Sequence, residues 1–478
     1  MRTTTLTAVG LLGLALLTPA YSASAAAETC RGEAATIVGT GPTLTGTEGR
    51  DVVVTGTATS IDALGGDDLV CVTGGGNINR LDVKAGYGND VVDTTALGAT
   101  SYVTVDLGAG ADLLEGGAAD ESVTTGFAEG FGGADGDTDL VRTREGDDRV
   151  GVGSVGPSAE ANIDAVELGP GDDIATTESR TMPSGAVVDG GEGTDQISVD
   201  FTNDGAASVD MGEGIVRVGD DPGARTMSLT SFETADISTT WPGGSGAWGP
   251  ASVSYTGTSR DDVVTLRLDR SASDPDVSVQ TYSGDDQVLF TNTPTSDTRV
   301  NTGRGDDELV AASPNGRVRL DLARGVWRSA RFFGDPEYWG STPDVVTSAV
   351  DNVENAFLMA PEAKLVGDGR ANELSINACR AAVRGGAGAD HLTVIAGDPF
   401  WDVFSYDCTP TATMSGGPGT DRLRGGAGKD RLRGEGGHDR LQGRGGNDVL
   451  LGGKGLDVAN GGKGRDRCTA ERERRCER

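Results

Sequence analysis

Residues 416–469 read GGPGTDRLR, GGAGKDRLR, GEGGHDRLQ, GRGGNDVLL, GGKGLDVAN and GGKGRDRCT, six copies of one nine-residue unit without a gap. Every unit has Gly at its first and fourth positions and Asp at its sixth, and four of the six have Leu at the eighth. Two to three glycines in four residues disfavour a helix but allow a tight turn with positive φ. The last three residues place one apolar side chain on one face, which is typical of a short half-buried strand. Each unit is therefore predicted to be one turn and one strand.

The turns also predict a binding chemistry. Glycine turns expose carbonyl oxygens, and the Asp at the end of each turn adds a carboxylate. Hard cations that prefer oxygen ligands bind such sets of groups. A flexible Gly-rich tail is the alternative, but low-complexity linkers do not keep an Asp and a Leu at fixed offsets. The array is therefore predicted to bind cations.

The run resembles the RTX, or haemolysin-type, calcium-binding nonapeptide GGxGxDxUx. The resemblance implies a parallel β-roll in which two successive nonapeptides complete one coil and Ca²⁺ lies between turns stacked on the same side. It implies four facing pairs of carboxylates: Asp421 with Asp439, Asp430 with Asp448, Asp439 with Asp457, and Asp448 with Asp466. The implied ligands are Asp421, Asp430, Asp439, Asp448, Asp457 and Asp466, with the carbonyl groups of Gly417, Gly419, Gly426, Gly428, Gly437 and Gly446.

The units depart from this pattern at four places. Glu435 and Arg444 replace the second glycine, and Ala459 and Cys468 replace the apolar eighth residue. The last coil is therefore expected to be a weakly packed cap.

Weaker copies of the same turn recur upstream. Asp68, Asp90 and Asp112 follow one another at intervals of 22 residues, which is about the length of one coil of a parallel β-solenoid with short loops. The upstream turns are candidate metal sites of second rank, because Asp also stabilises turns through local hydrogen bonds without a metal. These candidates are Asp68, Asp90, Asp112, Asp173, Asp195, Asp307 and Asp390.

The predicted fold class is all-β, a parallel β-roll or β-solenoid that stacks glycine-aspartate turns and short strands. Residues 28–206 are predicted to be degenerate coils, 207–415 a continuation of the solenoid, 416–469 the tandem calcium-binding roll and 470–478 a charged, solvated tail. Within the second segment, residues 208–214 and 231–233 are echoed by 319–325 and 352–354. Aromatic insertions at 241–248 and 327–339 are expected to pack locally, or else to contact sugars or a protein partner.

Residues 1–27 are predicted to be a secretory signal, with one Arg, a short apolar run and small residues that offer cleavage sites. No other stretch is apolar and long enough for a transmembrane helix. Six cysteines in an exported protein predict disulfides. Sequence leaves 15 connectivities open, and proximity favours Cys30–Cys71, Cys379–Cys408 and Cys468–Cys476.

Composition and motifs narrow the function. The formal charge of −33 makes nucleic acid an improbable partner of the main body and favours cations. The two histidines, His391 and His438, form no HExxH motif, and no GxSxG motif is present. We therefore predict a secreted calcium-binding scaffold or adhesion protein, without catalytic activity, that contacts a cell-surface glycan or protein. The alternative is a carbohydrate-active β-helix, a polysaccharide lyase or epimerase, stabilised by calcium repeats.

Overall fold

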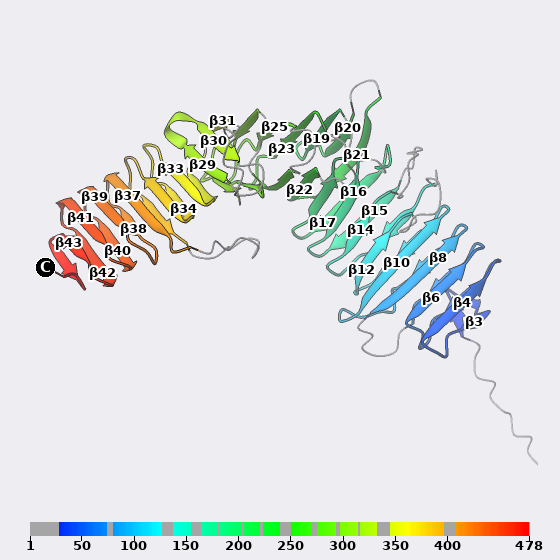
Figure 1. Cartoon of the computed structure of the whole chain (residues 1–478). Coiled ribbons are helices and arrows are strands. Elements are labelled where there is room, and N and C mark those ends of the chain that lie inside the picture. Colours follow the sequence, from blue (N-terminus) through cyan, green and yellow to red (C-terminus); the bar gives the residue numbers. More distant parts are fainter. Residues whose placement is uncertain are drawn as a thin grey trace, which may run out of the picture.

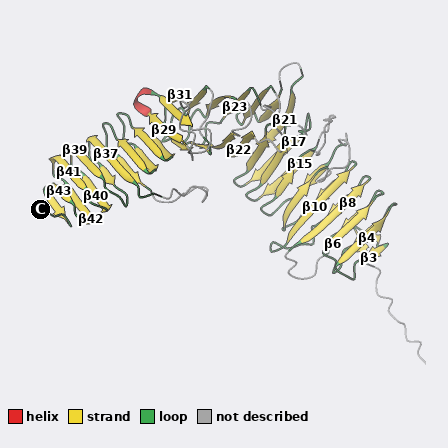
Figure 2. Ribbon diagram, in the orientation of Figure 1, coloured by secondary structure: helices red, strands yellow, loops and turns green. Residues whose placement is uncertain are grey.

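The computed structural model describes residues 28–73, 80–126, 137–153, 164–179, 182–202, 205–219, 223–239, 250–268, 275–292, 297–313, 316–331, 345–395 and 408–477. The expected signal segment and the aromatic insertion at 241–248 lie outside these residues, as do residues 332–339 of the second insertion. Figure 1 shows one elongated, bent stack of strands, with β3 at one end and β43 at the other. Figure 2 shows that nearly all of its regular structure is strand.

Two long sheets run the length of this stack, and each coil outside two insertions contributes one strand to each of them. The odd sheet contains β3 (Ile37–Val38), β5 (Val52–Val54), β7 (Leu69–Cys71), β9 (Val91–Asp93), β11 (Leu113–Glu115), β13 (Leu140–Arg142), β15 (Ala165–Pro170), β17 (Val187–Glu192), β19 (Ala206–Asp210), β20 (Ile215–Val218), β21 (Arg225–Thr230), β23 (Ser252–Thr256), β25 (Asp276–Gln280), β27 (Thr298–Asn301), β29 (Gly316–Asp321), β30 (Val326–Arg331), β31 (Val345–Asp351), β33 (Glu362–Val366), β35 (Arg380–Arg384), β37 (Thr411–Pro418), β39 (Arg431–Gly437), β41 (Val449–Gly455) and β43 (Arg467–Thr469).

The even sheet contains β4 (Thr43–Thr47), β6 (Ser60–Leu64), β8 (Leu81–Tyr87), β10 (Tyr102–Ala109), β12 (Asp120–Thr124), β14 (Arg149–Gly151), β16 (Ile174–Glu178), β18 (Gln196–Asp200), β22 (Thr234–Thr239), β24 (Val263–Leu268), β26 (Gln287–Phe290), β28 (Glu308–Ala312), β32 (Asn355–Met359), β34 (Glu373–Asn377), β36 (His391–Val394), β38 (Arg422–Arg424), β40 (Arg440–Gly445), β42 (Val458–Lys463) and β44 (Arg472–Arg474).

The coil lengths confirm the predicted solenoid. In the array, Arg422 of β38 pairs in parallel with Arg440 of β40, 18 residues on, so two nonapeptides make one coil. Upstream, the hydrogen bond from Asp68 to Asp90 spans 22 residues. The fold is therefore the all-β, parallel solenoid that the repeats predict.

A narrow aliphatic core lies between the two sheets. The single apolar residue of each unit points inward, so Leu423 and Leu441 stack along the even sheet while Leu432 and Leu450 stack along the odd sheet, all at 1% exposure or less. Because the sheets supply mainly Val, Leu and Ala, the interior stays thin along the rod. Each coil thus depends on its two neighbours to bury its apolar face.

The internal repeat corresponds to two antiparallel insertions in the odd sheet. β21 pairs in parallel with β17, β20 runs antiparallel between β21 and β19, and β19 pairs in parallel with β23. The strands β31, β30 and β29 repeat this arrangement between β27 and β33. A short 3-10 helix, η1 (Leu322–Arg324), turns the chain from β29 into β30. The two echoed sequence segments therefore fold as two copies of one three-stranded meander.

Trp327 lies in the second meander and is buried. Its ring packs edge-on against Phe290 with centroids 5.1 Å apart, and the side chain is 1% exposed. For this residue the structure confirms the expectation that the insertion packs into a local core.

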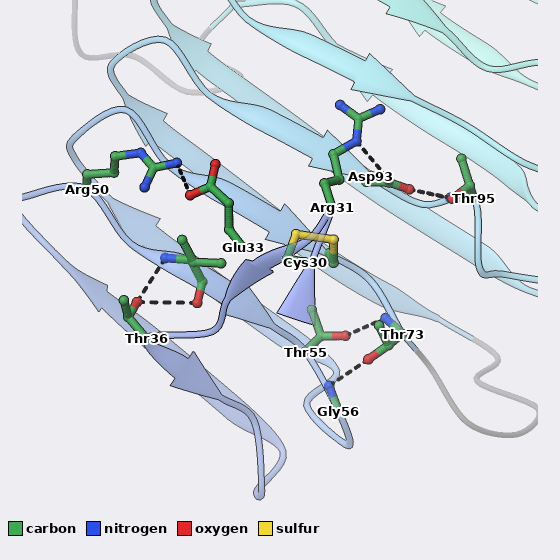
Figure 3. The surroundings of a disulfide bond; sticks show 12 residues. Cys30, Arg31, Glu33, Thr36, Arg50, Thr55, Gly56, Thr73, Asp93 and Thr95 are labelled. Carbon is green, nitrogen blue, oxygen red and sulfur yellow. Dashed lines mark hydrogen bonds and ion pairs between the residues drawn. A yellow bond between two sulfur atoms is a disulfide. The ribbon is translucent and has the colours of Figure 1, made fainter. Parts of the chain in front are cut away.

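The first coil is covered by a hairpin of β1 (Thr29–Cys30) and β2 (Glu33–Ala34). Figure 3 shows the Cys30–Cys71 disulfide that ties this hairpin to the odd sheet. Two ion pairs assist it, Arg31 with Asp93 at 2.9 Å and Arg50 with Glu33 at 2.7 Å. The other disulfides join Cys379 to Cys408 and Cys468 to Cys476, so all three expected pairs are confirmed. None of the helical residues that the structure describes forms a helix long and apolar enough to cross a membrane.

We predict that Cys30→Ser with Cys71→Ser destabilises the first coils. A loop of 41 residues is closed by this disulfide, which corresponds to about 4 kcal/mol by chain entropy. Since coils contact only their neighbours, the loss should stay local. Amide hydrogen exchange should therefore speed up in β3 to β7 and not in β39 to β43. The pair Cys468→Ser with Cys476→Ser, which opens a loop of 8 residues, is the control, with an expected loss of about 2.5 kcal/mol. Equal exchange rates in β3 to β7 with and without the first disulfide would contradict the prediction.

Candidate metal centre

The Asp turns lie along the two long edges of the stack. At the odd-to-even edge the chain passes from the odd sheet to the even sheet, and at the even-to-odd edge it returns. The array alternates between these edges, because each unit is one turn and one strand. Asp421, Asp439 and Asp457 therefore lie at the odd-to-even edge. Asp430, Asp448 and Asp466 lie at the even-to-odd edge.

Within each edge the Asp residues form a ladder of hydrogen bonds. The backbone N–H of one Asp donates to Oδ1 of the Asp one coil further on: Asp421 to Asp439 at 2.9 Å, Asp439 to Asp457 at 2.9 Å, Asp430 to Asp448 at 2.8 Å, and Asp448 to Asp466 at 2.9 Å. The structure thus brings together all four pairs that the repeat resemblance implied.

The C-terminal tail closes both ladders. The Asp457 N–H donates to Glu471 at 2.8 Å, and the Asp466 N–H donates to Glu477. The bond from Asp457 lowers the pKa of Glu471. The same tail adds β44 to the even sheet beside β42. Residues 471–475 and 477 are exposed, as expected of a charged, solvated tail, and they also form a structured cap, which the sequence analysis did not predict.

The second carboxylate oxygen of most of these Asp residues has no hydrogen-bond partner among the described residues. This holds for Oδ2 of Asp421, Asp439, Asp448, Asp457 and Asp466, each of which belongs to a side chain at most 1% exposed. Asp430 differs, because its Oδ2 accepts the Gly426 N–H at 2.7 Å and its Oδ1 accepts the Ala412 N–H at 2.7 Å. A buried charged oxygen without a partner is costly, so five of the six sites favour a compensating cation.

Burial also raises the pKa of these carboxyl groups. The pKa of Asp421 rises to about 7, mainly through burial and further through the charges of Asp390 and Asp439, against the lowering effect of one backbone hydrogen bond. Burial raises the pKa of Asp448 to about 6, and that of Asp439 rises for the same reason. The ladders therefore hold protons more tightly than ordinary carboxylates do, and a cation would compete with those protons.

The glycines leave room for the carboxylates and for the next coil. A Cβ on Gly416 would collide with Oδ2 of Asp421, and a Cβ on Gly437 would collide with the carbonyl oxygen of Gly419. The first glycine is therefore required by the buried carboxylate, and the fourth by a carbonyl that points along the stack.

The six implied glycine ligands fall into two groups. Gly417, Gly419, Gly437 and Gly446 have φ values of 120°, 155°, 140° and 113°. Gly426 and Gly428 lie outside this positive-φ region. Their turn lies against Pro410 instead of an earlier glycine turn. The even-to-odd ladder of the array therefore starts here with a different turn geometry.

Glu435 and Arg444 hold the left-handed backbone of the glycines they replace, with φ of 80° and 74°. We predict that Glu435→Gly raises the free energy of unfolding by about 1 kcal/mol, because a left-handed residue with a side chain costs about 1–2 kcal/mol and the added chain entropy of Gly offsets part of the gain. Urea unfolding at saturating calcium would measure it. Gly453→Ala, at the matching position one coil on with φ of 113°, should be destabilising. A lower free energy of unfolding in Glu435→Gly would show that the left-handed backbone of Glu435 is not strained.

Upstream, the acidic ladder changes edge along the chain. At the even-to-odd edge it runs through Asp51, Asp68, Asp90, Asp112, Asp139 and Asp164. At the odd-to-even edge it runs from Glu121 through Asp148, Asp173 and Asp195 to Glu233, then from Asp262 through Asp286 and Asp307 to Glu354, and from Asn372 through Asp390 into Asp421. All seven second-rank candidates are members, or rungs, of these ladders. Three of them lie at the even-to-odd edge and four at the odd-to-even edge.

Several of these upstream carboxylates share the chemistry of the array. Oδ2 of Asp68, Asp90, Asp173, Asp195 and Asp390 is buried without a hydrogen-bond partner among the described residues. Burial raises the pKa of Asp173 to about 7 and of Asp90 to about 6. These five upstream candidates therefore fit a cation by the same criterion as the array, a buried carboxylate oxygen without a partner among the described residues.

The ladder is interrupted where the two meanders enter. Glu233 and Glu354 take the place of Asp there, and each accepts the backbone N–H of the preceding rung, at 2.9 Å from Asp195 and 3.1 Å from Asp307. Sequence analysis missed both as ladder residues, although each ends an echoed segment of the internal repeat, S-F-E and N-V-E. The longer side chain bridges the displaced turn.

Asn372 is a neutral rung after the second meander. Its Oδ1 accepts the Asp368 N–H at 2.9 Å, and its Nδ2 donates to the Glu354 carbonyl oxygen at 2.7 Å. Arg370 neutralises the carboxylate of Glu354. Between Glu354 and Asn372 the side-chain polar groups are therefore paired within the protein, so this part of the ladder does not need a cation.

Side chains alone do not complete a metal site. No group of three or more His, Cys, Asp and Glu residues that could hold a metal occurs in the part of the chain that the structure describes. Each step offers two stacked carboxylates, and backbone carbonyl oxygens of the turns must supply the rest. That mixture suits Ca²⁺, which takes six to eight oxygen ligands in flexible geometry.

The array and one upstream segment match a known family. The model of the RTX calcium-binding nonapeptide repeat, in four copies, matches residues 104–127, 415–450 and 442–472. These segments therefore contain RTX calcium-binding repeats, as the resemblance predicted. The upstream match covers the turn of Asp112 and the start of the odd-to-even ladder at Glu121. No curated protein matches the chain.

Proposed function

We propose that this is an exported calcium-binding scaffold, in which Ca²⁺ enters between stacked Asp turns and stabilises the solenoid. The observation that carries the proposal is the set of buried carboxylate oxygens without partners in Asp421, Asp439, Asp448, Asp457 and Asp466, within segments that match a calcium-binding repeat. The charge of a bound cation would offset both the burial of these oxygens and the repulsion along each ladder.

The array has three pairs of stacked Asp residues, here called steps, in which both carboxylates have a buried oxygen without a partner among the described residues. Asp421 with Asp439 and Asp439 with Asp457 are two steps at one edge, and Asp448 with Asp466 is one at the other. Carbonyl groups of Gly417, Gly419, Gly437 and Gly446 are the proposed further ligands. The step from Asp430 to Asp448 is proposed to bind more weakly, because Asp430 already accepts two backbone N–H groups. Gly426 and Gly428 belong to that weaker step.

Upstream, we propose weaker sites at Asp68, Asp90, Asp112, Asp173, Asp195, Asp307 and Asp390. Five of these seven turns lack the full glycine pattern of the array, whereas Asp195 and Asp390 end complete GGxGxD turns. Extracellular calcium modules bind at about 10⁻⁴ to 10⁻³ M. The rod is thus proposed to stiffen when it meets calcium outside the cell.

Export and a scaffold or adhesion role complete the proposal. Three disulfides in one chain are typical of oxidising compartments outside the cytoplasm. A long solenoid presents two extended outer faces at which a surface glycan or protein can be bound.

The test is a calcium titration of metal-free protein from Glu28 onward, followed by far-ultraviolet circular dichroism and by thermal unfolding. We expect a rise in unfolding temperature and a gain in β signal, both with midpoints of about 10⁻⁴ to 10⁻³ M. Magnesium at the same ionic strength is the control, because it demands octahedral geometry and gives up water reluctantly. An unfolding temperature and a β signal that do not change with calcium would contradict the proposal.

The carbohydrate-active alternative has one observation in its favour. A cleft of 620 Å³ at the first meander is lined by Glu213, Arg260, Asp261 and Tyr282. Carboxylates, a guanidinium and a phenol in one hollow are groups that glycan-cleaving enzymes use. Incubation with acidic polysaccharides and detection of new chain ends would test it, with Glu213→Gln and Tyr282→Phe as variants. Unchanged polysaccharide would remove this alternative.

A further inference from the structure

The basic residues of the C-terminal coils gather on a surface that calcium binding does not use. Residues 416–469 contain 11 Lys and Arg against 7 Asp and Glu, in a chain of formal charge −33. Six of those seven acids are the buried ladder Asp residues, so the exposed charge of this region is strongly positive. Figure 1 shows the odd-sheet strands β33, β37 and β39 following one another along this part of the rod, with β35 between the first two.

The outer face of the odd sheet is hollowed between β29 and β39. Three hollows of 330, 410 and 430 Å³ share lining residues, among them Lys364, Arg380 and Thr413, and so form one groove. The outward side chains of β35 and β37 at its centre are small, with Ala382 beside Thr413 in register. The groove exists because small residues lie between two rows of long ones.

The long side chains on both sides of this floor are cations. Register places Lys364 next to Ala382 on one side and Arg431 next to Thr413 on the other. Three strand spacings of about 4.8 Å separate these two cations, or about 14 Å. Arg317, Arg319 and Arg328 line one end of the groove. Between β33 and β39 the groove cations are Lys364, Arg380, Arg384, Lys429, Arg431 and Arg433.

These six cations have no acidic partner in the described part of the chain. Five are exposed, and Lys364 is partly exposed. The groove includes two carboxylates, and both are engaged: Glu362 pairs with Arg317 at 3.0 Å and Glu435 bonds to the Ser415 hydroxyl. Unpaired guanidinium groups facing a groove favour an anionic occupant, since Arg binds carboxylate and sulfate groups through two parallel hydrogen bonds.

We propose that this groove binds an extended acidic polysaccharide. The spacing between Lys364 of β33 and Arg431 of β39 admits one chain, and Arg380 and Arg384 lie at the two ends of β35 beside it. The hydroxyl groups of Thr411, Thr413 and Ser415 on the floor can bond sugar hydroxyls. The inference does not rest on the calcium proposal, because Arg380, Arg384 and Arg431 lie on outer strand faces, whereas Gly416, Gly417 and Lys429 of the groove border the metal-binding edges. The acidity of the remaining chain confines an anionic polymer to this surface.

Two other polyanions fit the groove less well. Proteins that bind single-stranded nucleic acid stack bases on aromatic side chains, and none of the described residues that line the three hollows is aromatic. The ladder carboxylates of a second copy are buried, at 2% exposure or less for Asp68, Asp90 and Asp112, and cannot reach the arginines.

The test is affinity electrophoresis and calorimetry of the mature protein in saturating calcium, with polygalacturonate and heparin as probes and neutral dextran as the control. The triple variant Arg380→Gln, Arg384→Gln and Arg431→Gln removes three groove cations. Its matched control is Arg422→Gln, Arg424→Gln and Arg440→Gln, which removes the same charge from the outer face of the even sheet. Circular dichroism and calcium-dependent unfolding of both variants would show whether the fold and the calcium sites are intact.

We expect the groove variant to lose about tenfold to hundredfold in affinity for at least one acidic probe, with a shallower salt dependence, and the control variant to lose less than about threefold. Equal losses of affinity in the two variants would overturn the proposal, because they would show that the probe is attracted by the overall positive charge and not by the groove. Absence of binding by a wild-type protein that still responds to calcium would overturn it and leave the calcium function standing. Tighter binding of single-stranded DNA, or self-association lost only in the groove variant, would also overturn it in favour of a different partner.

Discussion

Replacing Asp439 by Asn should raise the stability of the metal-free protein and remove most of the stabilisation that calcium gives. Asp439 is the middle rung of its edge, so it belongs to two proposed calcium steps. Its Oδ1 accepts the Asp421 N–H at 2.9 Å, while its Oδ2 is buried without a partner among the described residues. Asn has the same shape and keeps the first bond, but it places no charge in the interior. A neutral amide already occurs in the ladder at Asn372, whose backbone N–H donates to Asp390 and whose Nδ2 donates to the Glu354 carbonyl oxygen.

The expected loss of calcium-dependent stabilisation in Asp439→Asn follows from mass action. A site at 100 times its dissociation constant stabilises the folded state by about 2.7 kcal/mol, and loss of two shared steps should therefore remove several kcal/mol. Thermal unfolding of Asp439→Asn and wild type, each in chelator and in excess calcium, measures both effects.

Asp430→Asn is the matched control for this prediction. Both oxygens of Asp430 accept backbone N–H groups, from Ala412 and Gly426. An amide nitrogen cannot accept, so one of these bonds is lost, and the metal-free protein should become less stable. A calcium response of wild-type size in Asp439→Asn would remove the odd-to-even edge of the array as a calcium site.

The repeats made much of this structure predictable. Gly at fixed offsets, Asp at the sixth position and one inward Leu predict a turn, a ladder rung and a core residue, and the resemblance to RTX repeats implied the coil of two units, 18 residues, that the structure shows. The three disulfides also followed, because neighbouring coils bring nearby cysteines together.

The position of each turn and strand in the folded rod was not predictable from the sequence in the same way. The sequence shows that Asp112 and Asp173 each end a turn, but only the winding of the chain places them at opposite edges. The meanders reverse strand direction at Gly214 and Gly325, with φ of 65° and 61°, but these glycines do not tell from the sequence that the strands on either side pair antiparallel within the odd sheet. Their rungs are Glu233 and Glu354, which a search for Asp after Gly cannot find. The groove depends on small residues of β35 and β37 lying in register between cations of β33 and β39, a relation across strands that are far apart in the chain.

The stability of the metal-free protein should fall as pH rises from about 4 to about 7, and calcium should reverse this trend. Burial raises the pKa of Asp421 and Asp173 from 3.8 to about 7, and that of Asp448 to about 6. In this window the folded chain binds more protons than the unfolded chain, so unfolding releases protons and higher pH favours it. The stability contributed by protonated rungs is complete below about pH 4 and is lost as pH passes through 6 to 7.

Calcium needs the deprotonated carboxylates, so its stabilising effect should be small near pH 5 and large at pH 8. The two curves of unfolding temperature against pH should therefore diverge as pH rises. Metal-stripped protein without chelator avoids the pH dependence of the chelator itself, and Asp439→Asn should show a smaller gap between the curves. A metal-free unfolding temperature that rises from pH 4 to pH 7 would mean that the buried rungs are not protonated in the folded chain. In that case repulsion between ionised carboxylates, relieved by cations at any pH, would be the force that calcium acts against.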